Sequence, residues 1–371
     1  MTPAGAFSPL RLMWARRRRG IGQVELADSV QISVRAIKFY EAGAFAPARE
    51  PLRRIARLLR FPERFFLRDP IGDLDPEAAS FRSRTKLSAR QRDTALGSAA
   101  VAMAFTAEIE RLYALPEPDF PDLDHRKSPE QTAEFVRRKW CLDEQPIESM
   151  MQLLESKGVR VFSLPGDAVD SGTFSLWRRK QPFVFLDVTK PQIERRLDLA
   201  HELGHLVLHR HEAPAGPKAQ QVASAFASAL LMPAAAIRVD APSSPVIAQL
   251  VHLTQKWGVP VTAIVHRLHS LGILSKWQYR KLRLEIAEQP SLSAKEAFDG
   301  RERPLLLQRV FASMRARGVT KHKIASTVHI YPKDLDELVF GLAAAGLDAP
   351  ADVRVSLQRL PPRLTLVSST K

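Results

Sequence analysis

Two histidines and a glutamate stand in an order that suits hydrolytic zinc chemistry, in the segment His201-Glu202-Leu203-Gly204-His205. On a helix, residues four positions apart lie one above the other, so both imidazoles can reach a single metal ion. The carboxylate of Glu202 can then act as general base on the metal-bound water. The motif predicts metal ligands at His201 and His205 and a catalytic residue at Glu202.

The residues around this motif favour a helix at the edge of a core. Leu199, Leu203 and Leu206 recur at helical spacing, and charged residues at positions 195, 196 and 198 make one side of the preceding turn polar. A lone histidine on such a face is usually a core residue with a satisfied hydrogen bond. Two histidines at this spacing, with a glutamate between them, instead favour a metal site or a site descended from one.

Two blocks of sequence carry a resemblance to a known family. Residues Leu199 to His209, followed by Ala223 to Pro233, resemble the ImmA/IrrE-type metallopeptidases in content and in order. The resemblance covers most of the chain between residues 128 and 310. It implies a zincin-like fold with Zn²⁺ as cofactor.

One position departs from that family's pattern. The family's third zinc ligand is a glutamate three residues before the alanine of the second block, and here Gln220 holds that place. A neutral amide oxygen is a poorer partner for zinc than a carboxylate, and the site loses one negative charge. The resemblance therefore implies ligands at His201, His205 and Gln220, with weakened zinc affinity.

Neighbouring residues leave a second set of ligands open. His209, His211 and Glu212 follow the motif within two helical turns. His211 falls at the third-ligand position of the longer zincin pattern H-E-x-x-H-x-x-G-x-x-H, but Leu208 replaces its glycine. Either Gln220 or one of these side chains completes the predicted site.

Charge and composition limit the kind of protein and partner. The chain has 371 residues, 45% of them hydrophobic, which suits two or three domains with real cores. Its net charge is +15, and residues 1–70 alone carry 14 Lys and Arg against 6 Asp and Glu. This concentration favours a polyanionic partner. With one cysteine, no stretch of roughly 18 apolar residues and no leader-like N-terminus, we expect a cytoplasmic protein without a membrane partner.

A helix-turn-helix pattern lies within the basic N-terminal segment. Residues Gln23 to Asp28 form one short helical pattern, and after a turn Ser33 caps a second that runs through Tyr40 and stops at Gly43. Polar side chains stay on the outer side of this pair, where they could contact a major groove. The side chains expected to contact DNA there are Gln23, Ser33, Arg35 and Lys38.

The same segment resembles the Cro/CI-like (XRE) DNA-binding domain over residues 10 to 68, with Gln23-x-Glu25-Leu26-Ala27 and Tyr40-Glu41-Ala42-Gly43 among the matching strings. The resemblance implies a homodimer that binds a double-stranded DNA operator through the second helix. Two positions depart from the pattern, since Gln31 replaces the turn glycine and Gly22 replaces a capping threonine. The basic run that begins with Arg16 and Arg17 is either a solvated face or a set of phosphate contacts.

The rest of the chain predicts an α+β arrangement. A linker covers residues 69–81, helical spacing runs over 85–115, and strand patterns at 158–162, 173–177 and 182–186 precede the metal helix. Residues 20–37 align without gaps on 318–335, which predicts a second helix-turn-helix-like unit. Its second helix is acidic and suits packing or a partner contact rather than DNA, because of Asp334, Asp336 and Glu337.

We therefore expect an α+β, mostly α protein with five segments. They are an all-α helix-turn-helix domain (1–70), a linker and connecting helix (71–127), a zincin-like domain with a small β-sheet (128–240), its helical extension (241–290) and a C-terminal helical region (291–371). The two resemblances imply a DNA-binding transcriptional regulator whose metallopeptidase-like domain senses a signal or cleaves a regulatory protein. Two alternatives stay open: a catalytically impaired pseudo-peptidase that serves as a sensor or oligomerisation module, and an active zinc endopeptidase localised by its DNA-binding head.

Overall fold

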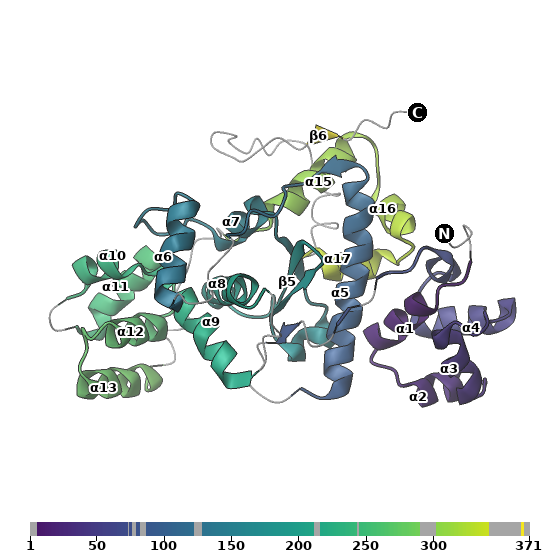
Figure 1. Cartoon of the computed structure of the whole chain (residues 1–371), viewed down its shortest axis with the longest axis horizontal. Helices are drawn as coiled ribbons and strands as arrows, with labels where there is room; N and C mark the ends of the chain where they lie inside the picture. The colour runs from purple at the N-terminus through teal and green to yellow at the C-terminus, as the bar shows by residue number, and fades with distance from the viewer. Residues whose placement is uncertain are drawn as a thin grey trace.

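The computed structural model describes residues 6–72, 74–75, 79–81, 87–121, 128–210, 216–242, 245–289, 302–340 and 365–366. A helical head lies at one side of the molecule, next to the long helix α5 (Ala89–Glu110). A small sheet occupies the middle, between α5 and the helix α8 (Gln192–Leu208), and further helices lie beyond α8 (Figure 1). The predicted class, α+β and mostly helical, is confirmed.

The head forms a helix-turn-helix at the predicted place. The side chain of Ser33 accepts a hydrogen bond from the backbone N–H of Ala36 at 3.2 Å, and Gly43 ends the second helix with φ +75°. Gln31 has φ +53°, a left-handed value that favours the glycine it replaces. The elements of the head are α1 (Pro9–Arg18), α2 (Gln23–Ser29), α3 (Val34–Ala42), α4 (Arg49–Leu59) and the 3-10 helix η1 (Glu63–Leu67).

The central sheet has the strand order β1-β4-β5-β3. Three strands lie where the sequence predicts them: β3 (Arg160–Ser163), β4 (Phe174–Arg178) and β5 (Gln181–Leu186). Strand β5 pairs parallel with β3 and antiparallel with β4. The fourth strand, β1 (Ser80–Phe81), lies in the segment for which the sequence predicts a linker, and it pairs antiparallel with β4.

Alternation along the strands divides the interior into two cores. Side chains that alternate along a strand point to opposite faces, and here both faces are buried. Phe162 and Phe185 belong to the core that contains α5 and the head, whereas Val161 and Val184 belong to the core that contains α8. The α8 core extends through the α-helices that lie on that side of the sheet.

Helices surround α8 on the side away from α5 (Figure 1). They are α6 (Pro129–Lys139), α7 (Met150–Ser156), α9 (Gly216–Leu231), α10 (Ala234–Asp240), α11 (Ile247–Trp257), α12 (Val261–Ser270) and α13 (Lys276–Ala287). The 3-10 helix η3 (Gly166–Ser171) connects β3 to β4, and a second pairing joins β2 (Tyr113–Ala114) to β6 (Thr365–Leu366).

Among the described residues no single helix is long and apolar enough to cross a bilayer. The helices α9 and α10 reach the required length and hydropathy only when they are taken together, and they are bent by 62° relative to each other.

The C-terminal region contains the predicted second helix pair. After α15 (Leu305–Ala316), α16 (Lys321–Val328) and α17 (Pro332–Leu338) occupy the positions that the alignment assigns to α2 and α3. His329 has φ +55° in the turn, at the position that corresponds to Gln31 of the head. The apolar residues that define the alignment are buried: Ile324, Ala325, Val328 and Ile330.

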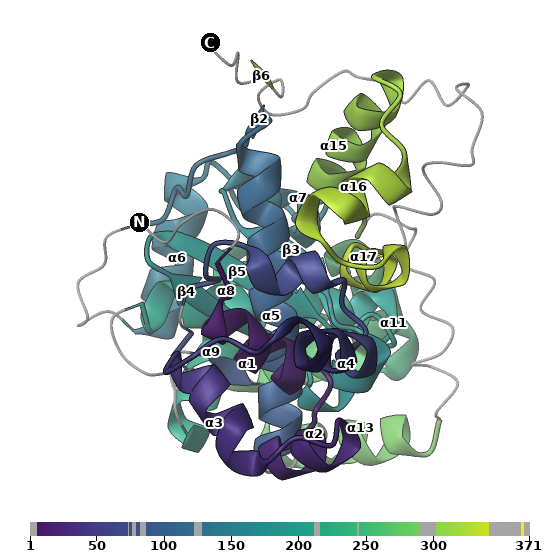
Figure 2. The same ribbon diagram turned by 90° about the vertical axis from the view of Figure 1, so that its right-hand side faces the viewer.

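The head is docked on the body through α1 and α5, which lie side by side in both views (Figure 2). A Cβ atom added at Gly97 of α5 would lie 2.3 Å from the backbone nitrogen of Arg18 and 2.6 Å from its Cα. Glycine is therefore required where the two helix backbones approach each other. One continuous core runs from the head across α5 to the aromatic face of the sheet.

Candidate functional site

Helix α8 carries the predicted zinc-binding motif, and its two histidine side chains converge beside the central sheet. His201, Glu202 and His205 are all buried, and Glu202 is 0% exposed. Gly204 lies within the motif, and a Cβ added there would be 3.0 Å from the backbone oxygen of Ala223 in α9. The missing side chain thus lets α9 approach α8 closely. This approach brings the candidate third ligand to the histidines.

The imidazoles of His201 and His205 converge. Their Nε2 atoms lie 3.1 Å apart. Two nitrogen ligands at about 2.0 to 2.1 Å from a tetrahedral zinc ion are separated by about 3.3 Å, so the two rings are placed as such a site requires. The other ring nitrogen of His201, Nδ1, lies 3.1 Å from the hydroxyl of Ser224, a contact that orients the ring.

Gln220, the candidate third ligand, lies beside the histidines. Its Oε1 atom lies 2.9 Å from Nε2 of His201, and its amide nitrogen donates to the backbone oxygen of Phe81 at 3.4 Å. The donor set that meets at this point consists of two imidazole nitrogens and one amide oxygen. In the described parts of the chain no group of three His, Cys, Asp or Glu side chains is placed to hold a metal ion.

Of the alternative ligands, the structure describes His209, which contributes less to this geometry. Nδ1 of His209 lies 3.3 Å from Nδ1 of His205, on the opposite side of that ring from the nitrogen that faces His201. His211 and Glu212 lie outside the described residues. The residues fit a zinc ion through His201, His205 and the amide oxygen of Gln220, with a neutral oxygen where a carboxylate would bind more strongly.

Two serines that the sequence does not single out hold the carboxylate of Glu202. Oε2 of Glu202 accepts hydrogen bonds from Ser175 at 2.7 Å and from Ser80 at 2.8 Å. Ser175 could have been found from the alternation of β4, which places it on the α8 face between Phe174 and Leu176. Ser80 offers no such signal, because it belongs to a two-residue strand that pairs with a strand distant in sequence.

The predicted DNA-reading side chains differ in what they contact. Arg35 and Lys38 are exposed on α3, and the guanidinium of Arg35 lies over the ring of Phe39, 5.2 Å from its centroid. Ser33 is the N-cap of α3. Gln23 donates to Oε2 of Glu41 at 2.6 Å, which holds its amide against the end of α3.

Arg16 and Arg17, which the sequence analysis also considers as phosphate contacts, lie beside carboxylates of the chain itself. Arg16 is buried and forms two hydrogen bonds with the carboxylate of Glu41, at 2.6 and 2.9 Å. The guanidinium of Arg17 lies over Trp14 and 3.6 Å from Asp93 of α5, so it faces the body. These carboxylates neutralise the two guanidinium groups, which disfavours a contact of either arginine with a phosphate.

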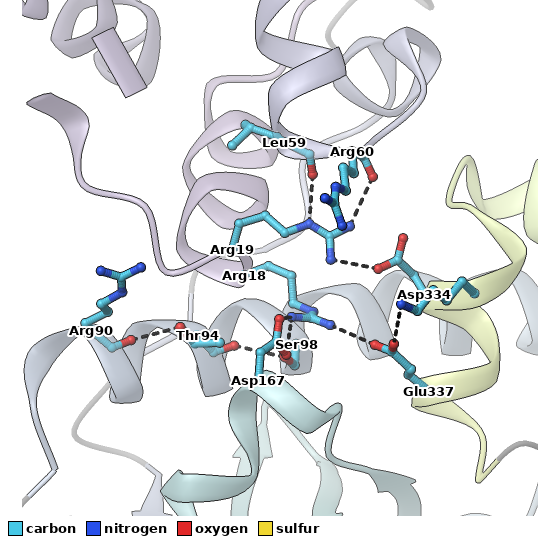
Figure 3. A network of polar contacts seen from close by, with 11 residues as sticks. Arg18, Arg19, Leu59, Arg60, Arg90, Thr94, Ser98, Asp167, Asp334 and Glu337 are labelled. Carbon is cyan, nitrogen blue, oxygen red and sulfur yellow. Dashed lines mark hydrogen bonds and ion pairs between the residues drawn. The ribbon is translucent and has the colours of Figure 1, made fainter. Parts of the chain in front are cut away.

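The next two arginines of the run join three parts of the chain (Figure 3). Arg18 contacts Asp167 of η3 at 2.6 Å and Glu337 of α17 at 3.4 Å. Arg19 contacts Asp334 of α17 at 2.8 Å and donates to two backbone oxygens at the end of α4. The acidic second helix of the C-terminal unit thus binds arginines of the head, as the sequence expectation of a packing role requires.

The geometry defines a chain in which a helix-turn-helix head is joined to a zincin-type helix. Family models match both parts. The helix-turn-helix family matches residues 12–66, and the IrrE N-terminal-like domain, a peptidase family, matches residues 154–269. The predicted fusion of an XRE-type head with an ImmA/IrrE-like domain is confirmed. No curated protein matches the chain.

Proposed function

We propose that this protein is a cytoplasmic transcriptional regulator that binds operator DNA as a homodimer and carries a metallopeptidase-like domain directed at a regulatory protein. The observation that supports it best is the position of α3. Its N-terminal turn is capped by Ser33 and exposes Arg35 and Lys38, and it lies farther from α5 than α1 does (Figure 1). A helix placed in this way can enter a major groove without displacing the body.

The chemistry of the second domain depends on zinc held by His201, His205 and Gln220. When bound, zinc would supply Lewis acidity and a water molecule of lowered pKa. Glu202 would accept the proton of that water on its carboxylate, and the hydroxyls of Ser80 and Ser175 fix the carboxylate's orientation. The amide of Gln220 lacks the negative charge of the family's glutamate, so this site would bind zinc weakly.

A second function is favoured by the same amide. If zinc is absent at cellular concentrations, the domain is a pseudo-peptidase that serves as a sensor or oligomerisation module. The pseudo-peptidase is supported by the contacts of Gln220, whose amide oxygen lies within hydrogen-bonding distance of His201 and whose amide nitrogen lies within hydrogen-bonding distance of Phe81. Both polar groups of the amide thus have a hydrogen-bond partner without a metal ion. The two functions share the DNA-binding head and differ in metal content.

Metal content and DNA binding test the proposal together. Protein purified without chelator should contain zinc near one equivalent if the site works in hydrolysis, and a content near zero supports the pseudo-peptidase. Glu202→Gln should abolish any hydrolysis of a protein substrate and leave operator affinity unchanged, because Glu202 lies in the body and not in the head. Failure of the wild-type chain to prefer any DNA sequence over random duplex would refute the regulator.

A further inference from the structure

The described residues between the head and α5 lie along the outer edge of β4. Ile71, Leu74 and Ala79 are buried along this path. A Cβ atom added at Gly72 would lie 2.8 Å from a guanidinium nitrogen of Arg178, at the end of β4. The described parts of this segment therefore run from one end of β4 to the other and finish in β1.

Strand β1 pairs with the half of β4 that lies beside the candidate site. Ser80 is opposite Ser175 and Phe81 is opposite Phe174 in an antiparallel register. The hydroxyls of Ser80 and Ser175 are 2.9 Å apart, and the rings of Phe81 and Phe174 have centroids 4.7 Å apart. Strand β1 therefore contacts β4 through backbone pairing and through both of its side chains.

The same two residues contact the site itself. The hydroxyl of Ser80 donates to the carboxylate of Glu202 at 2.8 Å. The backbone oxygen of Phe81 accepts from the amide of Gln220 at 3.4 Å. One short strand therefore touches both the candidate general base and the candidate third ligand.

An exposed strand edge is where an extended peptide adds to a sheet, through backbone hydrogen bonds and alternate side-chain pockets. The other edge of β4 pairs with β5, so the edge held by β1 is the one at which a peptide could pair with β4. A peptide that paired there would place its backbone next to Glu202 and Gln220. Strand β1 already stands in that place.

We propose that β1 is an internal peptide ligand that closes the metallopeptidase-like site, and that the edge of β4 receives an extended peptide partner once β1 leaves. The partner would carry a small hydroxyl-bearing residue opposite Ser175, followed by an aromatic residue that packs on Phe174. We call Ser80–Phe81 the closing strand. The proposal rests on the proposed function only in assigning a peptide to this domain.

The length of the closing strand makes exchange feasible. Two paired residues form few ladder hydrogen bonds, and the strand owes its occupancy largely to its covalent attachment, which gives it a high effective concentration. It is attached on its N-terminal side to the head, whose last helical turn ends at Leu67. Displacement of the head would pull on the closing strand and open the edge.

Peptide binding to the full-length chain tests the proposal. The probe is a fluorescein-labelled synthetic peptide that spans residues 75–86, titrated by anisotropy without added metal. In Ser80→Asp a second carboxylate meets Glu202, so the closing strand should be repelled. We expect this variant to bind the probe at least tenfold more tightly than the wild type, and the amides of β4 to exchange with deuterium at least tenfold faster.

The matched control is Ser88→Asp, the same change at the exposed N-cap of α5, where aspartate also caps well. It should behave as the wild type does. Equal probe affinity and equal exchange in Ser80→Asp and Ser88→Asp would overturn the proposal. Neither readout needs zinc or hydrolysis, so an inactive or metal-free protein still gives a result, and a failed function test leaves this one intact.

A disulfide variant keeps the test decisive if Ser80→Asp does not fold. Ser80→Cys combined with Ser175→Cys, in a Cys141→Ser background, joins two side chains that already face each other across the ladder. Oxidation should abolish the residual probe binding, and reduction should restore it. Probe binding that is the same in the oxidised and reduced forms would show that peptides bind elsewhere.

Discussion

Arg18 of the first helix and Glu337 of the last described helix form an ion pair at 3.4 Å, although 319 residues separate them in the sequence. Asp167, from the connection between two strands of the sheet, contacts the same guanidinium at 2.6 Å. The arginine side chain is only 3% exposed. The head, the sheet and the C-terminal unit therefore meet at one buried charge.

Removal of the Arg18 guanidinium should lower the free energy of unfolding of the whole protein. Arg18→Ala deletes charge-assisted hydrogen bonds to two carboxylates, each bond worth about 1.5 to 3 kcal/mol before the partly exposed carboxylates regain water. We expect a loss of about 2 kcal/mol in the free energy of unfolding, measured by urea denaturation. Arg17→Ala, a change in the neighbouring and more exposed arginine, should cost less than about 1 kcal/mol. Equal losses would contradict a special role for Arg18.

The close approach of α1 and α5 predicts a second effect. In Gly97→Ala the new methyl group would overlap backbone atoms of Arg18, which cannot move aside as the end of a side chain can. The helices must separate, at a cost of about 1 to 3 kcal/mol. Calorimetry of this variant should show a lower melting temperature than Gly166→Ala, because a Cβ at Gly166 meets nothing within 4 Å.

The head should lose DNA affinity in two distinguishable ways. Arg35→Ala or Lys38→Ala should weaken operator binding by about 1 to 3 kcal/mol and relax sequence preference, while the fold stays intact. Arg16→Ala should instead destabilise the head, because Glu41 loses the partner that neutralises it. Electrophoretic mobility shifts and circular dichroism on the same samples separate the two effects. If the Arg16→Ala variant kept its stability but lost DNA binding, Arg16 would instead be a phosphate contact.

Zinc affinity should rise when the neutral side chain at position 220 is replaced by a carboxylate. Gln220→Glu replaces the amide oxygen 2.9 Å from His201 with a carboxylate oxygen. We expect at least tenfold tighter zinc binding, about 1.4 kcal/mol, in a competition titration with a chelator. Gln221→Glu makes the same change at the adjacent exposed residue and should have no effect. If the two variants bind zinc equally, residue 220 is not a ligand.

A buried glutamate outside the site gives the protein a pH dependence. Burial raises the pKa of Glu155 from 4.5 to about 7, against the opposing hydrogen bonds from the N–H groups of Leu306 and Leu305. A raised pKa means that the folded state binds the proton more tightly, so this contribution to stability is present below pH 4.5 and is lost as pH rises through about 7.

Glu155→Gln removes the titration and keeps an oxygen that can accept both N–H groups. Relative to the wild type it should therefore gain stability between pH 5 and pH 8, by up to about 3 kcal/mol. The measurement is a series of urea titrations across that range. Glu148→Gln, the same change at an exposed position, is the matched control. A stability difference between Glu155→Gln and the wild type that does not change with pH would mean that the carboxyl of Glu155 is already hydrated.

Local patterns were enough to predict the helix-turn-helix and three strands of the sheet. The cap at Ser33, the stop at Gly43 and the helical spacing of the histidines depend on residues within a few positions of one another. The place of Gln220 followed from a resemblance and from its distance to the second block. These features need no knowledge of what packs against them.

The remaining features depend on contacts between distant segments. A run of arginines has the same composition whether water or carboxylates surround it, and the partners of Arg16 and Arg18 lie 25 and 319 positions away. Ser80 belongs to a strand too short to show alternation, and it is defined by its pairing with Ser175. Sequence spacing cannot reveal such residues, because tertiary structure alone brings them together.

The glycine at position 97 also bears on how this protein could be re-engineered. When DNA-binding domains are exchanged between proteins, the head is usually transferred as a unit that ends at the linker. Here a foreign head would have to present a helix backbone that can approach α5 closely at Gly97. It would also need an arginine that reaches Asp167 and Glu337. A productive chimera must therefore carry α1 with α5, and its junction belongs after residue 110, not at residue 70.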